Sequence, residues 1–218
     1  MPYFFATRRG DQVEITGQDA RHLALSLRAR PGERISVVEP AGRLLTVRLD
    51  AVSPTRISGS VEAELEHHPE PELSITVAVA MLPAASLELV LSRCTEAGAA
   101  RFVLVDAARS ISRASRPGRW ATICREAAML AGRLVVPEVV GPLPFQAAWE
   151  QADEPWLLDR SGRALSPLAG GATLFIGPEG GWSPEELNLG RGRVLSLGPR
   201  NMRADTAAVV ALALALGP

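Results

Sequence analysis

The sequence of 218 residues contains no lysine, so all 23 of its basic side chains are arginines. Arginine pairs bidentately with phosphate and stacks on nucleic-acid bases, which lysine does less well. The 24 acidic residues nevertheless leave a formal net charge of −1. Because an RNA-binding protein is normally basic, the overall charge does not by itself indicate a nucleic-acid partner.

Cysteine and histidine are also scarce. Cys94 and Cys124 have no C-x-x-C spacing and fall on the apolar faces of predicted helices, which favours reduced core thiols over a disulfide or a metal site. His67 and His68 stand in a proline-containing segment, and no histidine follows them. We therefore expect no metal.

Long hydrophobic runs and common nucleotide motifs are missing as well. The longest apolar run, 207–216, is too short to span a bilayer, and the amino terminus shows no signal-peptide pattern, so we expect a cytoplasmic protein with no membrane partner. The absence of G-x-G-x-x-G disfavours a dinucleotide-binding Rossmann domain. We find no internal repeat and no low-complexity tract.

The length and a hydrophobic content of 47% predict two domains. Residues 1–68 contain short alternating stretches and one short helix near 19–28, the pattern of a small β-barrel. The predicted strands are 12–16, 34–39, 44–49 and 56–62. The segment 67–72 has two prolines and no apolar residue, which is typical of a linker.

Residues 69–218 alternate between strands and helices and predict an α/β domain. The expected strands are 73–80, 101–106, 156–159, 173–176 and 194–197. One expected helix places Leu87, Val90, Leu91 and Cys94 on one face and ends at Gly98. Two further helices are expected at 119–131 and 207–216. Because the last is apolar on nearly all faces, we expect it to be buried.

The segment 174–186 combines an apolar strand, a loop with three glycines and a helix start. Ser183, Pro184 and Glu186 have the spacing of a capping box with proline at the first helical position. Glycines in the preceding loop permit positive φ and close approach of a ligand to the main chain. A second unit of this kind, 194–206, carries Arg200 and Arg203. Since ligands of open α/β sheets bind at the carboxyl ends of strands, the two loops predict one cleft.

These two motifs, GPEGG-W-SPEE and LSLGP-R-x-x-R-x-[DE]-T-A, resemble the RsmE family of the SPOUT class. Its members are the N3-specific uridine methyltransferases of 16S ribosomal RNA in the small subunit. Further similar segments at 21–33, 81–83, 93–98, 119–139 and 157–159 extend the resemblance along the chain. The resemblance implies a PUA-like, RNA-binding β-barrel over 1–68, a SPOUT methyltransferase domain with a trefoil knot over 69–218, and a homodimer.

The resemblance also implies S-adenosyl-L-methionine as cofactor. The two loops offer backbone donors and acceptors for adenine and ribose, and Leu158, Ile176 and Leu197 can flank the ring. The expected cofactor-binding residues are Leu157, Leu158, Ile176, Gly177, Pro178, Glu179, Gly180, Gly181, Leu195, Ser196, Leu197, Gly198, Met202, Arg203 and Thr206.

Methylation of a uracil imide nitrogen requires the loss of its proton. Arginine stays protonated and cannot be the base, but Arg203 can donate to the developing oxyanion, which makes it the catalytic candidate. Asp205 or Glu179 could accept the proton. Asp205 could equally serve the first turn of the last helix, where an anion is favoured. Arg200 could hold RNA phosphate, or a carboxylate across a subunit interface.

Charge is unevenly distributed. Residues 101–133 hold seven arginines against Asp106 and Glu126, a local balance of +5. This segment is either an RNA-binding surface or a solvated loop. The RNA-binding candidates are Arg8, Arg9, Arg21, His22, Arg28, Arg109, Arg113, Arg116, Arg119, Arg133 and Arg200.

Departures from the family pattern leave alternatives open. Ala84-Ala85-Ser86 stands where a lysine and a glycine are usual, and Asn201 and Asp205 also differ from the common residues. A catalytically weak, RNA-binding paralogue acting in ribosome assembly is therefore a second hypothesis. A phosphate-binding α/β enzyme acting on small molecules is a third, but it leaves the barrel and the arginine segment unused.

Overall fold

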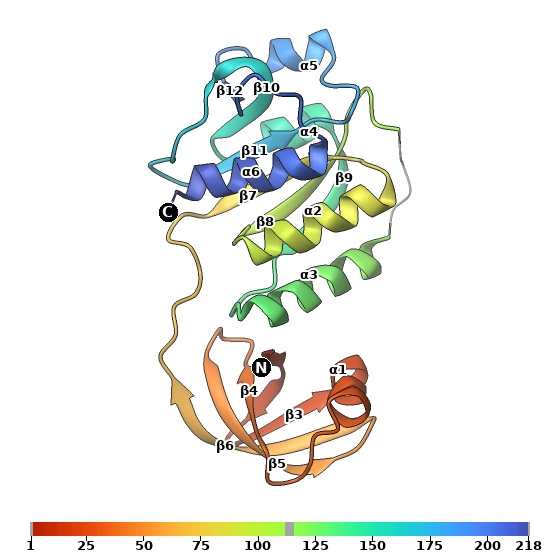
Figure 1. Ribbon diagram of the computed structural model, residues 1–218, viewed down its shortest axis with the longest axis vertical. Coiled ribbons are helices and arrows are strands. Elements are labelled where there is room, and N and C mark those ends of the chain that lie inside the picture. Colours follow the sequence, from red (N-terminus) through yellow and green to blue (C-terminus); the bar gives the residue numbers. More distant parts are fainter. Residues whose placement is uncertain (1, 112–115, 218) are drawn as a thin grey trace. The chain divides into compact units, whose positions relative to one another are not determined.

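A computed structural model of the chain describes residues 2–111 and 116–217, and Figure 1 shows its elements. The chain forms two compact units. Unit 1 consists of Met1–Glu70 and Ala128–Val135, and unit 2 of Pro71–Ala127 and Val136–Pro218. The sequence pattern did not indicate that a short segment from the middle of the chain joins the first unit.

Unit 1 is built on a mixed six-stranded sheet in the order β1-β4-β5-β6-β3-β2, with β1 and β4 parallel and the other pairs antiparallel. Its strands are β1 (Phe4–Phe5), β2 (Thr7–Arg9), β3 (Gln12–Thr16), β4 (Arg34–Val38), β5 (Leu44–Val52) and β6 (Arg56–Leu65). The four strands expected from alternation are confirmed. The short β1 and β2 were not predicted, because a segment of two or three residues is too short to show an alternation of apolar and polar side chains.

The helix expected near 19–28 is α1 (Gly17–Arg21) followed by a π-helical turn, η1 (His22–Ser26). Its Ala20 and Leu23 are buried against the sheet, together with Phe4, Ile15 and Met129. Alternate strand residues therefore supply the core, as the sequence pattern predicted.

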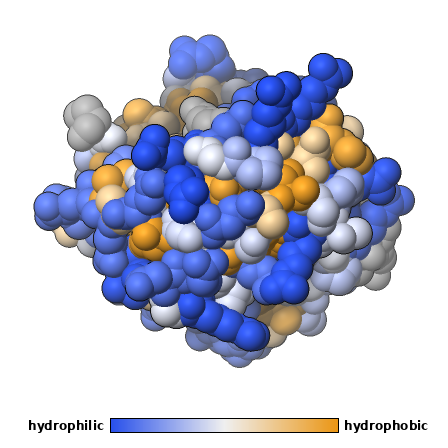
Figure 2. Space-filling view, turned by 90° about the horizontal axis from the view of Figure 1, so that it is seen from below, coloured by the Kyte–Doolittle hydropathy of each residue, from blue (hydrophilic) through white to orange (hydrophobic). Residues whose placement is uncertain are grey.

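The outer surface of unit 1 carries many charged side chains, and several of them form ion pairs with one another. Figure 2, viewed from below relative to Figure 1, shows mostly hydrophilic side chains separated by small hydrophobic patches. Arg34 pairs with Glu62 at 2.6 Å, and Arg56 pairs with Glu14 at 2.9 Å. The Glu62 hydrogen bond raises the pKa of Arg34. Many arginines of this unit thus already have acidic partners.

Unit 2 contains a six-stranded, wholly parallel sheet in the order β12-β10-β11-β7-β8-β9. Its strands are β7 (Ile75–Ala80), β8 (Arg101–Asp106), β9 (Glu138–Pro144), β10 (Pro155–Ala164), β11 (Ala172–Ile176) and β12 (Val194–Ser196). Its helices are α2 (Ala84–Glu96), most of α3 (Pro117–Ala131), α4 (Phe145–Glu150), α5 (Pro184–Leu189) and α6 (Ala204–Leu216). The α/β class expected from the sequence is confirmed.

Both faces of this sheet are covered, which explains its continuous apolar strands. Ile75, Val77 and Val79 of β7 belong to the cluster that includes α2 and α6, which Figure 1 shows on one side of the sheet. Ala78 and Ala80 belong to the cluster on the other side. That second cluster contains the aromatic residues Phe145, Phe175 and Trp182.

Two expectations about helices and thiols have different outcomes. Cys94 and Cys124 are buried free thiols, as predicted, and burial raises the pKa of Cys94 to about 12. Helix α6, which was expected to be buried, packs one face against α2 and the sheet, while Leu214 is 41% exposed in the single chain. No helix within the described residues is long and apolar enough to cross a membrane.

Candidate active site

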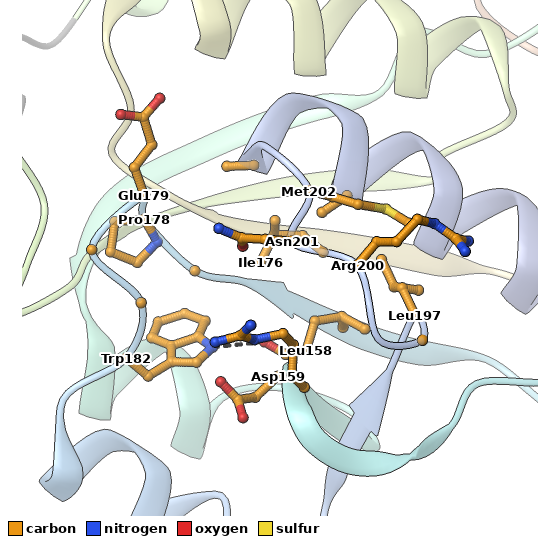
Figure 3. Close-up of a pocket in the computed structure, with 17 residues that line it drawn as sticks. Leu158, Asp159, Ile176, Pro178, Glu179, Trp182, Leu197, Arg200, Asn201 and Met202 are labelled. Carbon is orange, nitrogen blue, oxygen red and sulfur yellow. Dashed lines mark hydrogen bonds between the residues drawn. The ribbon is translucent and has the colours of Figure 1, made fainter.

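A cleft lies where β10, β11 and β12 end, at the carboxyl edge of the parallel sheet. Its volume is about 290 Å³, near the lower end of the range for small-molecule sites. Figure 3 shows side chains from the three strand ends converging on it. The cleft is lined by Leu158, Asp159, Arg160, Ile176, Gly177, Pro178, Glu179, Gly180, Gly181, Trp182, Leu197, Gly198, Arg200, Asn201, Met202, Ala204 and Ala207.

The glycine loop after β11 ends in the predicted capping box. Ser183 Oγ accepts from Glu186 N at 3.2 Å, and Glu186 Oε2 accepts from Ser183 N at 2.7 Å. Pro184 occupies the first helical position of α5. The backbone N–H groups of Ser183 and Glu186 thereby have hydrogen-bond acceptors, and these bonds hold the end of the loop in one place.

The three loop glycines differ in backbone conformation and in surroundings. Only Gly181 has a positive φ, of 68°, so backbone freedom explains that position. At Gly177 there is little room for a side chain, because an added Cβ would lie 3.0 Å from the indole ring of Trp182. Gly180 is exposed, and an added Cβ would meet nothing closer than Arg109 at 3.4 Å.

Trp182 joins two walls of the cleft. Its side chain is 3% exposed, and its Nε1 donates to the backbone oxygen of Leu158 at 3.1 Å, a hydrogen bond drawn in Figure 3. Its ring also packs against Phe145, with ring centroids 5.2 Å apart. The indole therefore supports the glycine loop from below and fixes the end of β10.

The glycine loop is also held from the segment that follows β8. Glu186 Oε1 accepts from the backbone N–H of Ala108 at 2.8 Å, so both oxygens of this buried carboxylate are used. Next to it, Arg109 Nη1 donates to the backbone oxygen of Gly180 at 2.9 Å. The residues after β8 thus contact both the loop and the start of α5.

An irregularity in β10 contributes lining residues that the sequence did not reveal. Leu158 and Arg163 both pair with Leu195 of β12, so the residues between them bulge out of the strand. Asp159 Oδ1 closes the bulge by accepting from the backbone N–H and the hydroxyl of Ser161. Asp159 and Arg160 consequently line the cleft, although neither was predicted as a site residue.

The loop after β12 forms the third wall. Gly198 has a φ of 99°, and its N–H donates to Ser196 Oγ at 3.1 Å, which turns the chain at the end of the strand. Asn201 and Met202 follow it and line the cleft. In Figure 3, Glu179 and Arg200 lie on opposite sides of the site.

Arg203 and its neighbours stand beside this wall. The side chain of Arg203 is 70% exposed, with Nη2 3.5 Å from Ser86 Oγ and 3.7 Å from Asp205 Oδ2. Asp205 Oδ1 accepts from the backbone N–H of Thr206 at 2.7 Å. Asp205 thus serves the first turn of α6, one of the two roles considered from the sequence.

The structure brings together ten of the fifteen expected cofactor residues in the cleft lining: Leu158, Ile176, Gly177, Pro178, Glu179, Gly180, Gly181, Leu197, Gly198 and Met202. Leu157 and Leu195 belong instead to the core. Ser196, Arg203 and Thr206 do not line the cleft. Trp182, Asn201, Ala204 and Ala207 complete it without having been predicted, although Trp182 belongs to the motif itself.

Several RNA-binding candidates already have partners. Arg133 is 4% exposed, and its Nε donates to Glu70 Oε2 at 2.9 Å, which counts against a phosphate contact. Arg119 donates to Glu88 Oε2 at 2.9 Å, a bond that lowers the pKa of Glu88. Arg8 donates to the backbone oxygen of Gly10. The exposed candidates are Arg9, Arg21, His22, Arg28, Arg109, Arg116, Arg119 and Arg200, of which Arg200 lines the cleft. Arg113 lies outside the described residues.

Known proteins share both the sequence and the fold of this chain. A family model described as an RNA methyltransferase domain matches residues 69–216. The ribosomal RNA small subunit methyltransferase E of Bacillus subtilis is 28% identical, covering 97% of this chain and 94% of that protein. The protein of that name from Mycobacterium bovis is 30% identical, covering 93% and 85%.

The structural comparison agrees. The crystal structure of a ribosomal RNA small subunit methyltransferase E from Neisseria gonorrhoeae, bound to S-adenosyl methionine, has a TM-score of 0.88 and 26% identity. It covers 97% of this chain and 95% of that one. The fold is that of an RNA methyltransferase domain. Within that class, the chain belongs to the ribosomal RNA small subunit methyltransferase E family, which confirms the resemblance drawn from its two loop motifs.

Proposed function

We propose that this protein transfers a methyl group from S-adenosylmethionine to ribosomal RNA of the small subunit. The observation that carries the proposal is the cleft formed by two glycine loops at the carboxyl edge of a parallel sheet. A relative with this fold is described as bound to S-adenosyl methionine.

The residues of the cleft fit such a cofactor. Leu158, Ile176 and Leu197 offer apolar side chains to a flat ring, and the backbone at Gly177 and Gly180 offers polar groups close to it. Glu179 adds a carboxylate to the lining. When bound, S-adenosylmethionine supplies an electrophilic methyl group on a cationic sulfonium. The chain's own contribution is then to hold the two reactants in line.

We further propose N3 of a uridine in 16S ribosomal RNA as the methylated position, as the family resemblance implies. Its nitrogen becomes nucleophilic when its proton leaves, and negative charge then develops on the uracil oxygens. Arg203, exposed beside the third wall, can donate to such an oxygen. Of the two candidate bases, Glu179 is favoured because it lines the cleft, whereas Asp205 already accepts from Thr206.

The proposed domain roles are a PUA-like, RNA-binding barrel over 1–68 and a SPOUT methyltransferase domain with a trefoil knot over 69–218. The mixed sheet with exposed Arg9, Arg21 and Arg28 supports the first. The strand order supports the second. Strand β12 pairs with β10 at one edge, yet the helix that follows it, α6, returns to pack on β7 and β11.

A homodimer is also part of the proposal. Helix α6 consists almost entirely of apolar residues, but Ala213 and Leu214 are exposed in the single chain. An apolar helix face of this kind is typical of a subunit interface. Sedimentation of the purified protein would measure its oligomeric state directly.

The test of the function is methylation in vitro. Purified protein, labelled S-adenosylmethionine and small-subunit RNA from a strain lacking this gene should yield 3-methyluridine at one site, detected by mass spectrometry. RNA from the parent strain should accept little label, because the site is already modified. Binding of both cofactor and RNA without methylation would instead support the weakly catalytic paralogue.

A further inference from the structure

The peptide group between Gly180 and Gly181 is tied on both of its polar sides. Its carbonyl oxygen accepts from Arg109 Nη1 at 2.9 Å, and its N–H donates to the backbone oxygen of Pro178 at 2.8 Å. The second bond closes a turn within the glycine loop. The bond from Arg109 ties the loop to a residue 71 positions earlier in the chain. Without the Arg109 bond, only the short internal turn would restrain this peptide.

The side chain of Arg109 lies along the loop as well as bonding to it. A Cβ placed on Gly180 would stand 3.4 Å from Arg109 Cβ and 3.6 Å from its Cδ, so the aliphatic stem passes close to the glycine. The neighbouring residue is fixed too, because Ala108 N donates to the buried Glu186. Arg109 is therefore anchored at its backbone and directed at the loop.

Arg109 also influences the start of α5 electrostatically. The pKa of Glu185 is lowered, chiefly by its hydrogen bond with Ser183, with a smaller contribution from the positive charge of Arg109. One guanidinium thus faces a carbonyl oxygen and a nearby carboxylate. These are the partners of a structural arginine.

We propose that Arg109 is a positioning residue for the cofactor loop. This inference rests on the proposed function, because it assumes that Gly180 and Gly181, which line the cleft, contact S-adenosylmethionine. Two adjacent glycines have the largest backbone freedom to lose when a ligand binds. By holding the peptide between them in the free protein, Arg109 reduces that loss and raises cofactor affinity.

The inference separates Arg109 from the other arginines of its segment. Arg109, which donates to Gly180, should act on the cofactor, whereas Arg116 should act, if at all, on RNA. Arg109→Met keeps the aliphatic stem against Gly180 and removes the donor. Arg109→Lys restores a donor of similar reach. Arg116→Met is the matched control for the loss of one positive charge from this segment.

Calorimetry with S-adenosylmethionine is the first measurement. We expect Arg109→Met to weaken binding on the order of tenfold, the effect of one charge-assisted hydrogen bond, and Arg109→Lys to recover most of it. Arg116→Met should bind like the parent. Equal affinities for Arg109→Met and the parent would overturn the inference, and so would an equal loss in Arg116→Met, since that would indicate a general charge effect.

Two further measurements keep the outcomes distinct. Hydrogen exchange at the Gly181 amide in the free protein should accelerate in Arg109→Met, and an unchanged rate would contradict the proposed support. The salt dependence of RNA binding should be the same for Arg109→Met and the parent. A log–log slope lower by about 0.7 to 0.9 would instead assign Arg109 to phosphate. If the parent itself fails to bind S-adenosylmethionine, the proposed function fails, while hydrogen exchange still tests the role of Arg109.

Discussion

The indole Nε1 of Trp182 donates to the backbone oxygen of Leu158 at 3.1 Å, so a side chain from the glycine loop holds the strand that forms the opposite wall of the cleft. The same ring lies beneath Gly177. The width of the cleft between β10 and the loop after β11 therefore depends on where this indole sits. A change that displaces the indole should therefore alter the cofactor site.

Gly177→Ala is the first prediction. Its methyl group would lie 3.0 Å from the Trp182 ring, which is tighter than ordinary contact, so the ring or the loop must shift. We expect the affinity for S-adenosylmethionine to fall at least tenfold, measured by calorimetry. A blue or red shift of tryptophan fluorescence should accompany the loss.

Gly170→Ala is the matched control, because the φ of Gly170 is not positive, no atom of the described residues beyond its chain neighbours lies within 4 Å of the added methyl group, and the residue does not line the cleft. We expect its affinity to stay within about threefold of the parent, as no overpacking arises there. Equal losses in the two variants would show that the indole is not the reason for the effect at Gly177.

Arg203→Ala tests the proposed catalytic donor. If Arg203 stabilises charge only in the transition state, turnover should fall on the order of 10²- to 10³-fold, with cofactor affinity little changed. Its side chain is 70% exposed, so folding should be unaffected. Ser86→Ala removes only the 3.5 Å contact to Arg203 and should reduce turnover much less. Normal turnover in Arg203→Ala would exclude this residue from the chemistry.

Local patterns explain why much of the fold was predictable from the sequence. The capping box at Ser183 and Glu186 needs only residues three positions apart, and it was predicted in detail. Strand β9 was missed because Pro142 and Pro144 lack the N–H that a sheet requires. The strand exists because it lies at the edge of the sheet, where one side needs no partner.

The site was predicted less completely, for a different reason. Leu157 and Leu158 are adjacent in the sequence, but alternation sends Leu157 into the core and leaves Leu158 on the cleft. Asp159 lines the cleft because of a bulge in β10, and no local sequence motif predicts that bulge. Likewise, the pairing of Arg133 with Glu70 joins residues 63 positions apart, so sequence alone leaves Arg133 looking like a free cation.

Alkaline pH should destabilise the protein through Cys94. Burial raises its pKa from 9.0 to about 12, so above pH 9 the unfolded state loses a proton that the folded state keeps. Stability is therefore fully present below pH 9 and falls as the pH rises toward 12, by up to about 1.4 kcal/mol per pH unit. Urea unfolding at pH 8 and pH 10 measures this difference.

Cys94→Ala should flatten that pH dependence, although it lowers stability at both pH values by creating a cavity. Because the chain has no lysine, its other side chains of types that ionise in this range are only Cys124 and Tyr3. If the parent and Cys94→Ala lose the same stability between pH 8 and pH 10, another group is responsible.

Arg116 and Arg133 should respond in opposite ways to replacement by alanine, although both belong to the arginine-rich segment. Arg116 is exposed, so its loss should leave stability unchanged and, if it contacts phosphate, lower the log–log salt slope of RNA binding by about 0.7 to 0.9. Arg133 is 4% exposed and paired with Glu70, so its loss should cost about 3 kcal/mol of stability by leaving that carboxylate without its cation. The salt slope of Arg133→Ala should match the parent, since a buried guanidinium releases no counterions from RNA.

Chemical unfolding measures the stability of both variants, and RNA affinity at several salt concentrations measures their salt slopes. A lower slope in Arg133→Ala would mean that the Glu70 pair opens when RNA binds, whereas parallel plots for Arg116→Ala would move the RNA contacts to the exposed arginines of the barrel.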